Sequence, residues 1–169
     1  YIFRILDIGL AYYVIAAVMG VMLWLLLREK IREQRVAVSI LIPYLFLVLA
    51  ATLLARRVRN DVHLIIYPFW KIRAIMNGGA SRAWLRNEIL LNVLLLLPIG
   101  VLAPVFFKKR RFLWTVVAGV GVSISIEMLQ FLTHRGFAEI DDVIFNTLGV
   151  LVGFGIYSLI QKGRAYAQQ

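Results

Sequence analysis

The residue with the clearest chemical potential in this chain is Glu127, a glutamate inside an otherwise uncharged apolar stretch. Residues 112–133 (FLWTVVAGVGVSISIEMLQFLT) are numerous enough for one helix to cross a bilayer. A carboxylate at membrane depth costs about 3 kcal/mol or more, so such a residue usually has a partner and a function. Three other polar residues, Asn92, Asp142 and Asn146, lie in or beside neighbouring apolar stretches. We predict that these four residues form one polar site.

Helical spacing groups further polar residues with Glu127. Ser123, Glu127, Gln130 and His134 are spaced i, i+4, i+7 and i+11, which places them on one face of a helix with 3.6 residues per turn. The next apolar stretch begins only a short connection later. We therefore expect the two helices to be antiparallel neighbours with their polar faces toward each other.

The last apolar stretch repeats the same spacing. Asp142, Asn146, Gly149 and Gly153 follow one another at intervals of four, three and four residues. The two glycines form a small-xxx-small pair, which allows a neighbouring helix to approach closely in a membrane. We expect this approach to bring Asp142 and Asn146 level with the polar end of the preceding helix.

The composition shows which elements must position these residues. The chain is 62% hydrophobic, well above the roughly 45–50% of average proteins, and the excess lies in long blocks. Because no water satisfies backbone amides at membrane depth, such blocks cross as helices. We predict an all-α, polytopic integral membrane bundle that forms a single domain over residues 1–169, with about five transmembrane helices. The predicted spans are residues 8–27, 36–55, 89–107, 112–133 and 143–160.

The connection between the second and third spans contains an apolar segment of its own. Residues 62–70 (VHLIIYPFW) are too few to cross a bilayer and are rich in aromatic side chains. Tyr67 and Trp70 have the amphipathic rings that anchor segments at the membrane surface. We predict an interfacial or re-entrant segment here.

Charge predicts the orientation of the chain. The net charge is +10, and many of the cations lie at the ends of apolar stretches, which favours contact with a membrane surface and excludes nucleic acid as the expected partner. Arg28, Lys30, Arg32 and Arg35 share one short connection, and residues 108–111 (KKRR) form another. Short basic loops stay in the cytoplasm. We therefore predict a multi-pass plasma-membrane protein with the N-terminus outside and the C-terminus in the cytoplasm, and the resemblance described below implies that the membrane is bacterial.

With alternating spans, the start of the third, the end of the fourth and the start of the fifth lie on one side. In this orientation the polar residues converge in the outer leaflet. Arg56, Arg57 and Arg135 would lie near them and could contact phosphate. The chain has no cysteine, which excludes disulfides, thiol catalysis and cysteine metal sites. We predict no metal and no cofactor.

Three segments resemble motifs of the VanZ-like family of bacterial membrane proteins. Residues 92–100 (NVLLLLPIG), 127–131 (EMLQF) and 142–149 (DVIFNTLG) occur in the family's order and spacing, and the similar region covers about residues 62–157. The resemblance implies a role at the bacterial cell envelope in lowered susceptibility to glycopeptide antibiotics such as teicoplanin. It implies no defined catalytic activity.

Three classes of function stay open at this point. The favoured hypothesis is a non-enzymatic protein that binds a membrane lipid or a lipid-linked cell-wall precursor through the polar site. An intramembrane hydrolase or transferase is the alternative, with Glu127 and Asp142 as general acid and base; a divalent metal held by these carboxylates and His134 is a variant of it. A small transporter subunit is the third, and it would need an oligomer. A homo-oligomer is left open for all three.

Overall fold

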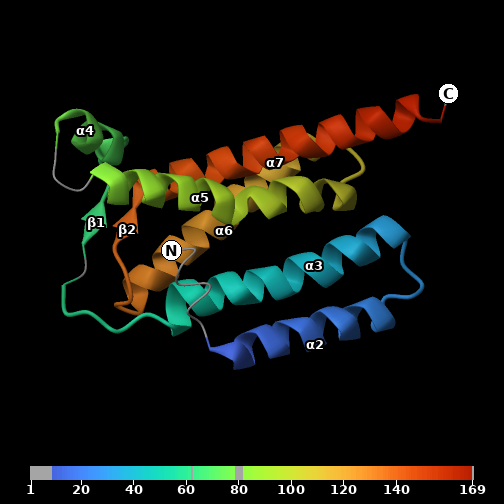
Figure 1. Cartoon of the computed structure of the whole chain (residues 1–169), viewed down its shortest axis with the longest axis horizontal. Helices are drawn as coiled ribbons and strands as arrows, with labels where there is room; N and C mark the ends of the chain where they lie inside the picture. Colours follow the sequence, from blue (N-terminus) through green and yellow to red (C-terminus); the bar gives the residue numbers. More distant parts are fainter. Residues whose placement is uncertain (1–8, 62, 79–81, 169) are drawn as a thin grey trace. The chain divides into compact units, whose positions relative to one another are not determined.

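The computed structural model describes residues 9–61, 63–78 and 82–168, and these are largely helical (Figure 1). The predicted all-α membrane fold is confirmed. Among the described residues, the only strands are two short segments that pair with each other. The chain divides into two compact units: residues 1–65 with 125–139, and residues 66–124 with 140–169.

The first unit contains a helical hairpin and the paired strands. Helix α2 (Leu10–Leu26) packs against α3 (Arg32–Leu49), which continues through one π-helical turn (Ala50–Leu54). Strand β1 (Leu64–Ile65) pairs in parallel with β2 (Ala138–Glu139). The C-terminal part of α6, from residue 125 onward, belongs to this unit as well.

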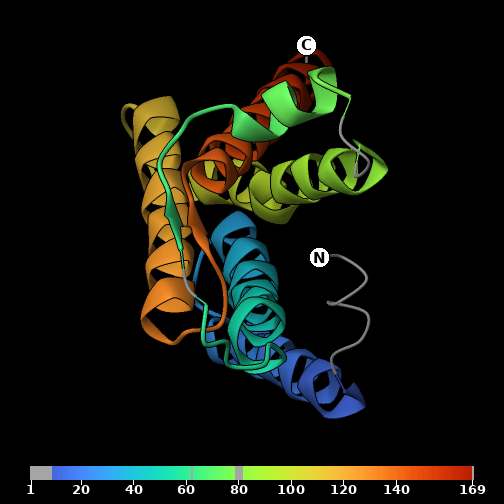
Figure 2. The same ribbon diagram turned by 90° about the vertical axis from the view of Figure 1, so that its left-hand side faces the viewer.

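The second unit is built on the packing of α5 against α7. It contains the short helix α4 (Trp70–Met76), α5 (Arg82–Leu102), which is followed by a 3-10 turn, and α7 (Ile140–Tyr166). The N-terminal part of α6 (Arg111–Leu132) completes it. α5 and α7 run side by side (Figure 1), and Figure 2 shows the same two helices after a turn of 90°.

The two glycines of the small-xxx-small pair explain how closely α5 and α7 pack. A Cβ atom at Gly149 would lie 1.9 Å from the carbonyl oxygen of Val93, and one at Gly153 would lie 2.2 Å from that of Leu97. The two contacts advance by four residues on each helix, so the helices are parallel. The predicted close approach is therefore present, and the partner is α5. Both helices begin at the same end of the second unit.

Four of the described helices are long and apolar enough to cross a membrane. They are Arg32–Leu54, Arg82–Phe106, Arg111–Leu132 and Ile140–Tyr166. The first predicted span, 8–27, corresponds to α2, a shorter apolar helix of 17 residues. At about 1.5 Å per residue it is roughly 26 Å long, close to the hydrocarbon thickness. Residue 8 lies outside the described residues.

The short α4 occupies the connection where an interfacial or re-entrant segment was predicted. Its seven residues are too few to cross a bilayer. The side chain of Tyr67 just before it is 72% exposed, as expected of an aromatic residue at a membrane surface. The next residue after the predicted segment, Lys71, is nevertheless completely buried. Residue 62, the first of that segment, lies outside the described residues.

Candidate functional site

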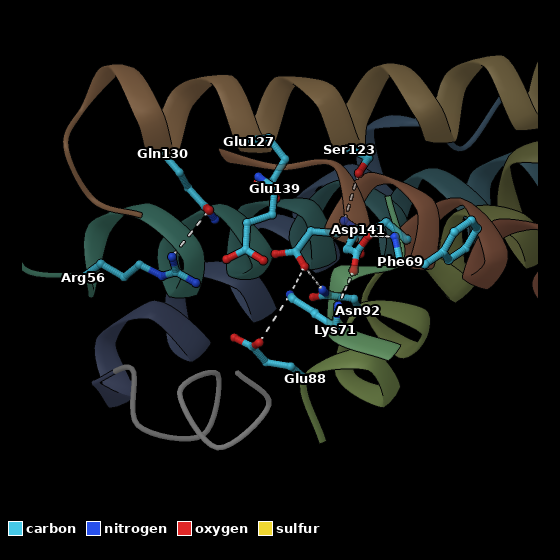
Figure 3. A network of polar contacts seen from close by, with 12 residues as sticks. Arg56, Phe69, Lys71, Glu88, Asn92, Ser123, Glu127, Gln130, Glu139 and Asp141 are labelled. Carbon is cyan, nitrogen blue, oxygen red and sulfur yellow. Dashed lines mark hydrogen bonds and ion pairs between the residues drawn. The ribbon is translucent and has the colours of Figure 1, made fainter. Parts of the chain in front are cut away.

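Lys71 is the centre of a buried polar cluster in the second unit (Figure 3). Its side chain is 0% exposed and its ammonium group forms ion pairs with Asp142 of α7 and Glu88 of α5. The distance from Lys71 Nζ to Glu88 Oε2 is 3.3 Å, and each carboxylate side chain is only 7% exposed. A buried ion pair loses about 3–5 kcal/mol when one partner is removed, because the other charge is then uncompensated. The cluster therefore ties α4 firmly to α5 and α7.

Asp141 fixes the first turn of α4 from the neighbouring helix. Its carboxylate accepts hydrogen bonds from the backbone N–H groups of Phe69 and Lys71, the latter at 2.9 Å. Phe69 precedes the helix in the left-handed conformation, with φ of 60°. The first N–H groups of a helix have no partner within it, and a carboxylate satisfies them while matching the positive end of the helix dipole. Asp141 thus caps α4 across a long stretch of chain.

Asn92 and Asp142 lie together, as the sequence predicted. The side-chain amide of Asn92 donates to Asp142 Oδ1 at 2.6 Å, and both residues are buried. The same oxygen accepts a hydrogen bond from the ammonium group of Lys71. Asp142 Oδ1 is therefore the acceptor that joins α4, α5 and α7.

Asn146 lies one turn further along α7 and contacts α6. Its amide donates to Ser123 Oγ at 2.9 Å, and both side chains are buried. This contact confirms that the polar faces of these two helices meet. Asn146 Oδ1 is also buried, and it receives no hydrogen bond from any residue the structure describes. Exchanging the amide oxygen and nitrogen would leave the nitrogen without a bond instead, because Ser123 Oγ can engage only one of them.

Glu127 belongs to the first unit, where it binds the last residue of β2. Its Oε2 accepts the backbone N–H of Glu139 at 3.0 Å. Ser123, Glu127 and Gln130 are all buried, as the predicted polar stripe on α6 requires. His134, the fourth residue of that stripe, is exposed beyond the end of α6, so the prediction is wrong for this residue. The predicted convergence of Glu127 with the residues of the second unit stays a prediction.

The predicted phosphate-binding arginines differ in their surroundings. Arg56 is buried and donates from Nη1 to Gln130 Oε1 at 3.4 Å and to the Arg135 carbonyl at 3.3 Å. Arg135 donates from Nη1 to three carbonyl oxygens at the end of the π-helical turn, those of Leu53, Leu54 and Arg56. Carbonyl oxygens at a helix C-terminus lack donors within the helix, and Arg135 caps this one; the Leu53 oxygen also accepts the backbone N–H of Arg56.

Arg57, the remaining predicted arginine, has an exposed side chain. His134, the residue added to the metal variant, is exposed too and has φ of 56° just beyond the end of α6. Within the described ranges, no group of three or more His, Cys, Asp or Glu side chains has the geometry to hold a metal ion.

Sequence reasoning missed Lys71, Glu88 and Asp141. Lys71 follows an aromatic segment and looked like one more surface cation, and Glu88 stands at the beginning of an apolar stretch. The available signal was the pair of adjacent aspartates at 141 and 142, because two neighbouring carboxylates at a helix start need separate donors. Only the fold shows that one chain segment supplies both sets of donors.

Comparison with known proteins agrees with the motifs. The VanZ/LLP1 family profile matches residues 36–161. Protein VanZ of Enterococcus faecium is 36% identical over 76 residues, which are 45% of this chain and 47% of that protein. The matched region thus spans about half the length of that relative. No solved structure matches the chain.

Proposed function

This chain belongs to the VanZ/LLP1 family, and from that premise we propose that it lowers bacterial susceptibility to glycopeptide antibiotics such as teicoplanin. It does so without catalysis, by binding a membrane lipid or a lipid-linked cell-wall precursor. The ligand is held at the end of the second unit where α5 and α7 begin.

One observation carries this proposal: a fully buried lysine and two carboxylates at the start of membrane helices. Ionised groups are expensive at that depth, and replacing a buried ion pair by apolar side chains is often neutral or stabilising. Stability alone therefore gives little reason for Lys71, Glu88 and Asp142 to be charged. Recognition of a polar ligand gives a direct reason.

The proposal also keeps the other residues that the sequence predicted. Asn146 offers a buried amide oxygen that can accept a hydrogen bond from a ligand hydroxyl or amide. Glu127, Gln130 and the arginines at 56, 57 and 135 belong to the first unit, and they have the polar groups and positive charge that favour a ligand with phosphate.

The proposal includes an orientation, with the N-terminus outside and the C-terminus in the cytoplasm. The exposed basic run at 108–111 follows α5 at the end opposite the Lys71 cluster. Such short basic loops face the cytoplasm. The beginnings of α5 and α7, and the cluster with them, are then in the outer leaflet, where wall precursors are used.

The orientation can be tested by labelling, because the chain has no cysteine of its own. Single cysteines at Arg73, on α4, and at Lys109, in the basic run, would be treated with a membrane-impermeant maleimide on intact cells. We expect labelling at residue 73 and protection at residue 109 until the cells are opened. The reverse pattern would contradict the orientation.

The function is tested in a susceptible Gram-positive host that expresses the chain. The measured quantity is the lowest teicoplanin concentration that inhibits growth of this host. We expect wild type to raise this concentration, and Asp142→Asn and Glu127→Gln to lose the effect at equal membrane levels. Glu29→Gln is the matched control, because Glu29 is exposed in the connection between α2 and α3. No protection by wild type would refute the proposed role, and full protection by both site variants would refute the proposed site.

A further inference from the structure

The charges in the Lys71 cluster do not balance. Lys71 supplies one positive charge, and Asp142 and Glu88 supply two negative charges in side chains that are 7% exposed. Asp141, which is completely buried, adds a third carboxylate, but backbone N–H groups satisfy that one. Excess negative charge is strongly disfavoured where water is largely absent. The described residues of the cluster therefore carry more negative than positive charge, and a further cation or a proton would balance it.

Acceptor atoms in the same cluster are left without hydrogen bonds. Glu88 is more than nine-tenths buried, and its Oε2 faces Lys71 Nζ at an ion-pair distance yet receives no hydrogen bond from any described residue (Figure 3). Asp142 accepts hydrogen bonds from Lys71 and Asn92, and both end on its Oδ1. One turn further along α7, the buried Oδ1 of Asn146 accepts no hydrogen bond from any described residue.

We propose that this cluster binds the primary ammonium group of a second molecule. An ammonium group carries one positive charge and three N–H donors and has no acceptor. It supplies a cation for the two carboxylates and a hydrogen-bond donor for Glu88 Oε2. Lys71 demonstrates the fit, because its own ammonium group already bridges these two carboxylates.

The depth of the cluster suits a head group. Glu88 is six residues beyond Arg82 and Asp142 is two residues beyond Ile140, which places them about 9 Å and 3 Å from the starts of α5 and α7. The head-group layer is about 5–7 Å thick on each side of the hydrocarbon. Exposed Trp84 marks the same end of α5 as lying at the membrane surface.

This inference rests on the proposed function and gives its ligand a chemical class. Two envelope molecules carry a primary ammonium group at this depth: a lipid with an ethanolamine head group, and a lipid-linked wall precursor with a lysine in its peptide. The chemistry is the same for both, and the experiment below separates them.

The test uses the full chain in lipid nanodiscs of phosphatidylglycerol. Either phosphatidylethanolamine or phosphatidylcholine is added, and bound lipid is measured by native mass spectrometry. The two lipids have the same net charge, but only phosphatidylethanolamine has N–H donors on its head group. We expect wild type to bind phosphatidylethanolamine about tenfold more tightly or better, because charge-assisted hydrogen bonds are made only to it. Glu88→Gln should abolish that preference, and the exposed control Glu29→Gln should keep it.

A second arm adds a soluble wall peptide with a free lysine ammonium group, and the same peptide acetylated on that lysine. Binding of the free peptide alone, lost in Glu88→Gln, would support the ammonium site with the wall precursor as its source. Absence of both the lipid preference and the peptide binding in wild type would overturn the proposal, and this outcome does not depend on any variant folding.

Infrared spectroscopy tests the competing explanation, a proton on Glu88. A protonated carboxylic acid has a carbonyl band that a carboxylate lacks. If wild type shows this band in the presence of phosphatidylethanolamine, and Glu88→Gln does not show it, Glu88 carries a proton and the ammonium site is overturned. The antibiotic assay is independent of both measurements. Protection without ammonium binding would contradict only this inference, and ammonium binding without protection would contradict only the proposed function.

Discussion

Replacing Gly149 by alanine tests the contact that sets the geometry of the candidate site. A Cβ atom there would lie 1.9 Å from the carbonyl oxygen of Val93. A carbon atom and a carbonyl oxygen approach no closer than about 3.3 Å in ordinary contacts. The two helices must therefore separate by about 1.4 Å at this level, since the obstacle is backbone and cannot rotate away.

The free-energy cost follows from what this separation breaks. Forcing an extra carbon into a packed interface costs about 1–3 kcal/mol. Two turns along α7, the hydrogen bond from Asn92 to Asp142 is 2.6 Å long and would be stretched beyond bonding distance. A hydrogen bond to a charged group contributes about 1.5–3 kcal/mol. We expect Gly149→Ala to lower the free energy of unfolding by about 2.5–6 kcal/mol and to weaken antibiotic protection as well.

The assay is reversible unfolding in mixed micelles with increasing SDS, followed by circular dichroism. Gly155→Ala is the matched control on the same helix, because a Cβ atom at Gly155 would meet nothing within 4 Å. Alanine there should be neutral or stabilise by up to about 1 kcal/mol through its higher helix propensity. If the two variants unfold at the same SDS fraction, the close contact between α5 and α7 does not hold the site together.

Three further outcomes are expected. Lys71→Met should destabilise the chain by about 3–5 kcal/mol in the same SDS assay, and adding Glu88→Gln should recover part of that loss; no recovery would mean that the pair is not coupled. Arg135→Ala should cost about 1–3 kcal/mol there because the carbonyl oxygens of Leu54 and Arg56 lose the guanidinium donor, and an unchanged midpoint would contradict the capping role. In an NMR titration the pKa of Asp61 should lie below the ordinary value because Arg59 donates hydrogen bonds to it, and Arg59→Gln should raise it. This lowered pKa means that the stabilisation from the pair is present above the ordinary aspartate pKa and is lost as the pH falls through the lowered value.

The sequence alone determined the elements that cross the membrane and the faces they bury. Long apolar stretches leave the backbone no alternative to a helix at membrane depth, so composition and length were sufficient. Helical spacing then placed Ser123, Glu127 and Gln130 on one buried face, and the glycine pair at 149 and 153 marked the surface of closest approach. These are local properties that follow from a period of 3.6 residues.

Tertiary structure alone decided which charges meet. Lys71 comes from a short segment whose pattern indicates the membrane surface. Its backbone N–H nevertheless donates to Asp141 and its ammonium group to Asp142, both about 70 residues away in the chain. Nothing in the spacing of residues predicts such a pairing, because it depends on how α4 folds back onto the start of α7. The sequence thus identified Asp142 as a candidate, and the packing of three helices supplied its partners.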